Sequence, residues 1–136
     1  MIRRDFIQAE IQKLAQVLAR IIGLKRDGRP DQAYELLKHS LSEHFDFNMD
    51  DLRELSTPDF LEELRKKNFP AEKADLLAQY LLEAVQPLQS QDPNARKILE
   101  KVLALFDFLE QEHHRQTLEN LQRRSAIDKF LKESNE

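Results

Sequence analysis

The chain of 136 residues contains no cysteine, no tryptophan and only two glycines. Without cysteine it has no disulfide bond, no thiolate ligand for zinc and no cysteine nucleophile. The two glycines are isolated in the sequence, so a glycine-rich phosphate-binding loop is absent. No apolar run approaches the roughly 20 residues that a membrane-spanning helix needs. We therefore predict neither a cofactor nor a membrane association.

The composition is typical of a soluble, folded protein. Hydrophobic residues make up 40% of the sequence and charged residues 34%, and the length fits a single domain over residues 1–136. The first residues, MIRRDFIQAEIQKLAQ, place charged and polar side chains among the apolar ones, which is unlike a signal peptide. Together with the lack of cysteine, this favours a cytoplasmic location. The net charge of −4 argues against nucleic acid as the partner.

The apolar residues recur every three or four positions along most of the chain, which predicts an all-α fold. Few residues break this pattern, and no segment shows the alternation of a β-strand. The predicted helices cover residues 3–25, 30–44, 48–55, 57–67 and 71–85, and a further helix begins at residue 93. After Leu109 the apolar pattern thins, and EQEHHRQT contains no apolar residue. We expect about six helices, with either a break near His113 to Thr117 or an exposed helical stretch that docks again later.

Two parts of the chain align with each other. LAQVLARIIG, from Leu14, matches LAQYLLEAVQ, from Leu77, and RPDQAYELLKHSL then matches DPNARKILEKVL. The shared features are Leu-Ala-Gln, a turn with proline, and then alanine followed by paired apolar residues. Chance similarity between amphipathic helices is the alternative. We interpret the match as a structural repeat, in which two helical hairpins flank a short helical insertion.

The segment GRPDQAYELLKHSL resembles the second helix of a tetratricopeptide repeat (TPR), which begins after a turn and has an alanine near its start. The longer stretch IRRDFIQAEIQKLAQVLARIIGLKRDGRPDQAYELLKHSL is similar to the opening of an uncharacterised bacterial family of small TPR-like proteins, known as a domain of unknown function. The resemblance implies an all-α, bacterial, cytoplasmic protein with TPR-like hairpins. It implies no activity and no catalytic residues.

A polar stripe on the first predicted helix is the candidate binding site. Gln8, Gln12, Gln16 and Arg20 follow one another at four-residue steps, opposite the apolar face. The TPR resemblance implies that this helix lines a concave surface where peptides bind, and the internal alignment adds Gln79 and Glu83. An ordinary solvent-facing helix side is the alternative, because every surface helix has one.

Three other functions compete with this hypothesis. Asp46, Asn48 and Asp50 have the spacing of the first three ligands of an EF-hand calcium loop. However, Asp51 and Thr57 occupy the positions where this loop needs glycine and glutamate. Glu110 and His113 have the Glu-x-x-His spacing of metal-carboxylate bundle enzymes, although a second copy is missing. The basic residues of a nucleic-acid-associated protein would be Arg3, Arg4, Arg123 and Arg124.

The residues together favour a non-catalytic module for protein–protein interaction. Its expected partner is a protein or peptide bound along the polar stripe, and pairing with a second copy into a homodimer is the alternative. We predict no metal site and no catalytic residue.

Overall fold

A computed structural model describes residues 2–86 and 93–134, without the side chains of residues 2–4 and 134. All regular structure in these residues is α-helical, which confirms the predicted all-α fold. The helices are α1 (Ile2–Arg26), α2 (Pro30–Phe45), α3 (Met49–Glu54), α4 (Thr57–Lys67), α5 (Ala71–Val85), α6 (Pro93–Glu112) and α7 (Leu118–Ser134). Seven helices within the described ranges replace the expected six, because α7 is a helix of its own.

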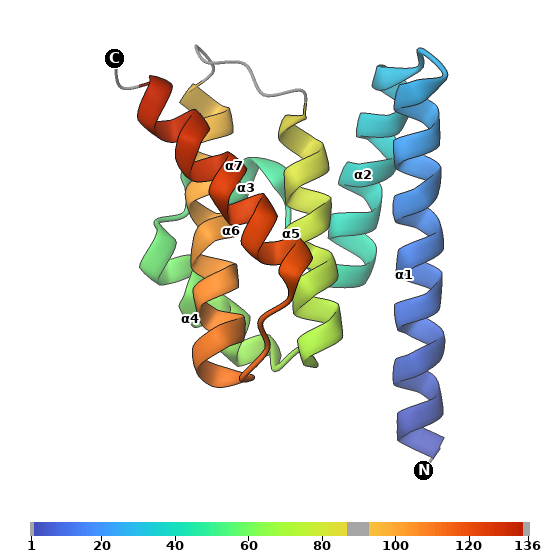
Figure 1. Cartoon of the computed structure of the whole chain (residues 1–136). Coiled ribbons are helices and arrows are strands. Elements are labelled where there is room, and N and C mark those ends of the chain that lie inside the picture. The colour runs from blue at the N-terminus through green and yellow to red at the C-terminus, as the bar shows by residue number, and fades with distance from the viewer. Residues whose placement is uncertain (1, 87–92, 135–136) are drawn as a thin grey trace. The chain divides into compact units, whose positions relative to one another are not determined.

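The chain forms two compact units, Met1–Met49 and Asp50–Glu136, and each is described by itself. The first unit contains the pair α1 and α2, which pack together and are joined by three residues (Figure 1). In the second unit α6 packs against α4, α5 and α7. Helix pairs therefore stand on both sides of α3 and α4 in the sequence. Their assignment as TPR-like repeats stays a prediction, as does a single domain.

The helices α1, α2, α4 and α6 are each followed by a residue with left-handed backbone conformation. Gly28, Asp46, Asn68 and His114 have φ values of 78°, 56°, 52° and 51°. After three of them the next amide closes the turn on a carbonyl five or six residues earlier: Arg29 N–H donates to Leu24 O at 2.8 Å, Phe47 N–H to Leu41 O at 3.1 Å, and Arg115 N–H to Leu109 O at 2.9 Å. This geometry satisfies carbonyls that the ending helix leaves open.

The buried apolar side chains follow the predicted helical spacing in both units. In the first unit they include Leu14, Leu18, Ile21, Ala33, Leu37 and Leu41. In the second unit they include Phe60, Leu64, Leu77, Tyr80, Leu81, Ile98, Leu99, Val102 and Ile127. None of the described helices combines the length and apolar character that crossing a membrane requires.

Candidate functional site

The four predicted residues of the first helix form one exposed stripe along α1. Gln8, Gln12, Gln16 and Arg20, here called the α1 stripe, are all exposed, and Leu14 and Leu18 on the other side of the helix are buried. The 25 residues of α1 give a length of about 37 Å, against about 24 Å for the 16 residues of α2. Figure 1 shows the N-terminal part of α1 extending past α2.

The side chains of the α1 stripe make no hydrogen bond or ion pair with other described residues. Each glutamine amide can donate and accept hydrogen bonds, and the Arg20 guanidinium presents five N–H donors. Large apolar side chains are also exposed on this helix: Phe6 is 70% exposed and Ile22 is 42% exposed. Residues two positions apart in a helix point to different sides, so Phe6 and Ile22 flank the α1 stripe rather than belong to it.

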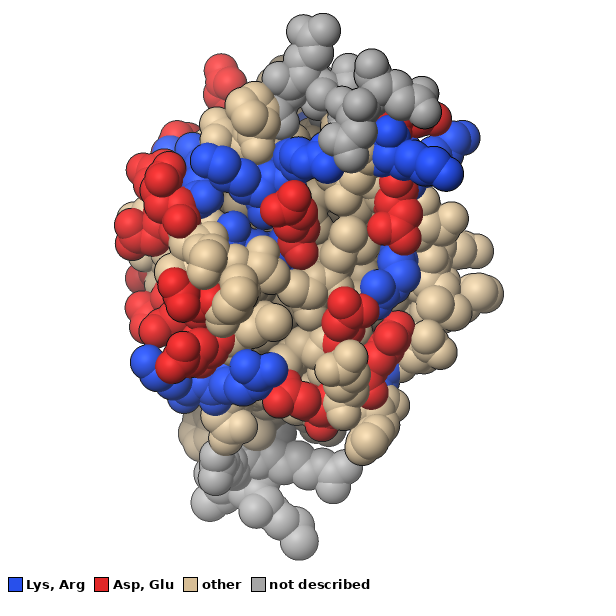
Figure 2. Space-filling view, turned by 90° about the vertical axis from the view of Figure 1, so that its left-hand side faces the viewer, with Lys and Arg blue, Asp and Glu red and all other residues tan. Residues whose placement is uncertain are grey.

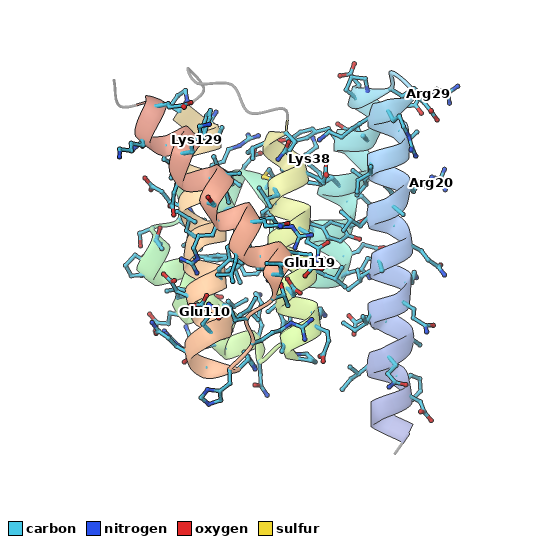
Figure 3. The ribbon with its side chains drawn as sticks, in the orientation of Figure 1. Arg20, Arg29, Lys38, Glu110, Glu119 and Lys129 are labelled. Carbon is cyan, nitrogen blue, oxygen red and sulfur yellow. The ribbon has the colours of Figure 1, made fainter. Side chains whose placement is uncertain are left out.

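Two further arginines of the first unit are exposed and lack an intramolecular partner. Arg26 ends α1 and Arg29 precedes α2, and neither makes an ion pair or a side-chain hydrogen bond among the described residues. Figure 3 shows Arg20 and Arg29 both pointing outward from the hairpin. Sequence reasoning did not include Arg26 and Arg29. Arg26 and Arg29 follow Arg20 by six and nine residues, on either side of the turn at Gly28. This nearness in the sequence is the signal that could have added them to the site.

Gln79 and Glu83, the predicted counterparts in the second repeat, lie on α5 and are half-buried. Glu83 also interacts with another group of the chain. These two residues belong to the second compact unit, whereas the α1 stripe belongs to the first. A groove shared by both sets of residues therefore stays a prediction.

Asp75 is the centre of a polar network in the second unit that the sequence did not predict. It is only 7% exposed on α5, and its Oδ1 accepts a hydrogen bond from Asn120 Nδ2 of α7 at 3.1 Å. Its Oδ2 accepts from Arg115 Nη2 at 3.3 Å. Arg123 Nη1 in turn donates to Asn120 Oδ1 at 2.7 Å. The two contacts of Asp75 join residues 45 and 40 positions apart, so helical periodicity gives no sign of them.

Glu110 lies in the last turn of α6, and His113 directly follows the last residue of that helix. Glu110 lies on α6 and accepts from Gln116 Nε2 at 3.0 Å and from Arg124 Nη2 at 3.4 Å. His113 lies beyond the end of α6, with its ring edge-on to Phe108 at 5.3 Å between centroids. Glu110 and His113 thus contact different side chains of the second unit. The described residues contain no group of three or more metal-ligating side chains gathered around one point.

The basic residues of the nucleic-acid alternative are engaged within the fold where they are described. Arg124 Nη2 lies 2.9 Å from Asp107 Oδ1, and Arg123 bonds Asn120. The side chains of Arg3 and Arg4 lie outside the described residues. On the face shown in Figure 2, acidic and basic side chains lie next to one another rather than in areas of one sign.

Comparison with known proteins gives no match: no family model, curated protein or solved structure corresponds to the chain. The similarity to a bacterial TPR-like family stays a prediction from the sequence. The candidate site therefore depends on its own geometry.

Proposed function

We propose that the chain is a non-catalytic protein-interaction module, which binds a protein or peptide along the exposed side of α1. The observation that supports this most is the α1 stripe, whose four polar side chains are exposed and have no intramolecular partner among the described residues. A partner can pair with these groups without first breaking contacts inside the protein. That lowers the desolvation and reorganisation cost of binding.

Exposed apolar groups on the same helix support the proposal further. Phe6 and Ile22 expose large side chains on the flanks of α1, between the α1 stripe and the buried side of the helix. Protein interfaces combine apolar anchors with a polar rim, and aromatic residues are enriched among the anchors. An ordinary solvent-facing helix requires neither side chain at these positions.

The test is retention of binding partners from a lysate of the native host, with one variant on α1 and a matched control. The α1 variant is Gln12→Glu, Gln16→Glu and Arg20→Glu combined. The control, Gln111→Glu, Gln122→Glu and Lys129→Glu, makes the same change in net charge at exposed positions of α6 and α7. Both variants are first shown to be folded by circular dichroism and urea unfolding.

We expect wild type and the control variant to retain the same partner, identified by mass spectrometry, and the α1 variant to lose it. Equal retention by all three proteins would place the binding surface elsewhere and contradict the proposal. If the protein retains only further copies of itself, and the α1 variant does not, the partner is a second copy.

A further inference from the structure

We infer that the partner bound along α1 is an acidic peptide segment, whose carboxylates meet the arginines that the first unit leaves unpaired; this inference rests on the proposed function. The three guanidinium groups of Arg20, Arg26 and Arg29 are exposed, and none makes an ion pair among the described residues. A guanidinium group binds carboxylates in a two-pronged geometry that fixes their orientation.

The arginines of the second unit differ from these three, because they contact polar side chains within their own unit. Each of the described arginines there has a polar side-chain partner within the unit: Arg53 with Asp50, Arg65 with Glu112, Arg96 with Glu100, Arg115 with Asp75, Arg123 with Asn120 and Arg124 with Asp107. Arg20, Arg26 and Arg29 depart from this rule together, within ten residues of chain.

Charge along this part of the chain also favours an acidic ligand. Residues 8–31 contain five basic and three acidic residues, of which Asp27 and Asp31 are the exposed acidic ones. From Gln8 to Ile22, the exposed positions of α1 carry Lys13 and Arg20 and no acidic side chain. Basic side chains on the same side of a helix attract acidic peptide segments and accelerate their association.

The spacing on α1 defines the peptide more closely. Lys13 and Arg20 are seven residues apart, nearly two helical turns, so they lie on the same side of α1 with Gln16 between them. Their separation along the helix axis is about 10 Å. A peptide in the polyproline II conformation advances about 3.1 Å per residue and returns to the same side every three residues, so acidic side chains three residues apart would match it. Gln12 and Gln16 can hydrogen-bond the peptide backbone between them.

A peptide fits these observations better than a nucleic acid. Residues 50–136 contain 18 acidic and 13 basic residues, and the whole chain has a net charge of −4. A long polyanion would be repelled by most of the chain and attracted only by a few groups, whereas nucleic-acid binding uses extended basic surfaces. A short acidic segment meets only the local charge of α1.

The experiment is a selection of phage-displayed random dodecapeptides on the immobilised full chain, followed by fluorescence titrations of the selected peptides. Each peptide is titrated against wild type, the variant Arg20→Glu with Arg29→Glu, and the control Lys129→Glu with Lys132→Glu. The two variants change the net charge equally, and the control residues are exposed on α7. Binding of a single-stranded DNA 20-mer is measured with the same proteins.

We expect selected peptides that carry acidic residues three positions apart. Their affinity should fall about tenfold or more in the Arg20→Glu, Arg29→Glu variant and remain unchanged in the control, since a lost charge contact is replaced by repulsion. Selected peptides without an acidic excess that still lose affinity in the Gln12→Glu, Gln16→Glu, Arg20→Glu variant would overturn the acidic inference and leave the proposed function standing.

Other outcomes overturn more of the account. Peptides that bind all variants equally contradict both the acidic inference and the proposed use of α1. A selection that yields no binding peptide overturns the acidic-peptide inference, while the partner-retention assay decides the proposed function separately. DNA binding that is lost in the Arg20→Glu, Arg29→Glu variant but kept in the control would replace the peptide by a nucleic acid.

Discussion

Arg115 in the second unit and Arg20 in the first are the same residue type in different settings. Arg115 Nη2 lies 3.3 Å from Oδ2 of the buried Asp75, and so joins the start of α7 to α5. Arg20 is exposed on the side of α1 and has no partner among the described residues. The difference indicates that Arg115 stabilises the second unit, whereas Arg20 remains available for binding. Substitution of Arg115 should therefore lower stability and leave binding unchanged. Substitution of Arg20 should weaken binding and leave stability unchanged.

The largest effect on stability is expected at Asp75. Asp75→Ala removes the buried acceptor of the hydrogen bonds from Asn120 and Arg115. The loss should lower the free energy of unfolding by about 2–3 kcal/mol. Arg115 is partly exposed, and its buried Nε has no hydrogen-bond partner among the described residues. The loss of stability should therefore be smaller than for a fully buried ion pair. Urea unfolding measures this value.

Asp128→Ala is the control for Asp75→Ala, because Asp128 is an exposed carboxylate on α7. We expect its substitution to change the free energy of unfolding by less than about 0.5 kcal/mol. Equal effects of the two substitutions would show that the Asp75 network does not stabilise the second unit.

Lys101 is the basic residue of α6 that should reduce stability. It is 2% exposed, and its Nζ donates to Lys97 O at the long distance of 3.5 Å. Burial lowers the pKa of Lys101, and Glu100 offsets this only in part. Because the folded-state pKa lies below the unfolded value of about 10.4, ionised Lys101 opposes folding at neutral pH.

Lys101→Met should therefore raise the free energy of unfolding by about 1 kcal/mol at pH 7. The gain should shrink as the pH rises towards about 10.4, where the unfolded lysine also loses its proton. Urea unfolding at pH 7 and at pH 9.5 tests both points, with the exposed Lys97→Met as the control. A loss of stability at pH 7 would show that Lys101 contributes favourable contacts that outweigh its burial.

The left-handed helix ends permit a smaller, paired test across the two units. Gly28→Ala places a side chain at φ 78° in open space, so backbone strain alone should cost about 1 kcal/mol. His114→Gly relieves the same backbone strain at φ 51° and should raise the free energy of unfolding by about 0.5 kcal/mol or more. Thermal unfolding measures both. The same sign for both substitutions would contradict the strain argument.

The smallest effect on stability is expected on α1. Arg20→Glu with Arg29→Glu should change the free energy of unfolding by less than about 0.5 kcal/mol, because neither side chain has an intramolecular partner among the described residues. Urea unfolding of this variant beside Arg115→Ala gives the comparison directly. A large loss in the α1 variant would show that these arginines stabilise the first unit.

The sequence predicted the helices well because their ends are coded locally. Gly28 marks the turn after α1, and Pro30 and Pro58 lie in the first turns of α2 and α4. At α4, Ser56 caps the helix, since its Oγ accepts from Asp59 N–H at 3.2 Å. The break after α6 was one of two predicted alternatives, from the loss of apolar residues between Glu110 and Thr117.

The contacts between distant parts of the chain could not be predicted from spacing. Asp75 and Asn120 are 45 residues apart, and nothing in the apolar pattern of α5 or α7 indicates that they meet. The exposure of the α1 stripe was expected from its position opposite the apolar face, and the structure bears it out. The lack of intramolecular partners for Arg20 and Arg29 depends on the positions of all neighbouring acids, which only the structure provides.

The most direct test of the account places the photo-reactive residue p-benzoylphenylalanine at Gln16, in the middle of the α1 stripe, in cells of the native host. Gln122, exposed on α7, is the matched control position. After irradiation, we predict a cross-linked protein partner from Gln16 and a much weaker product, or none, from Gln122. Equal products from both positions, or a product from Gln122 alone, would contradict the claim that α1 presents the binding surface.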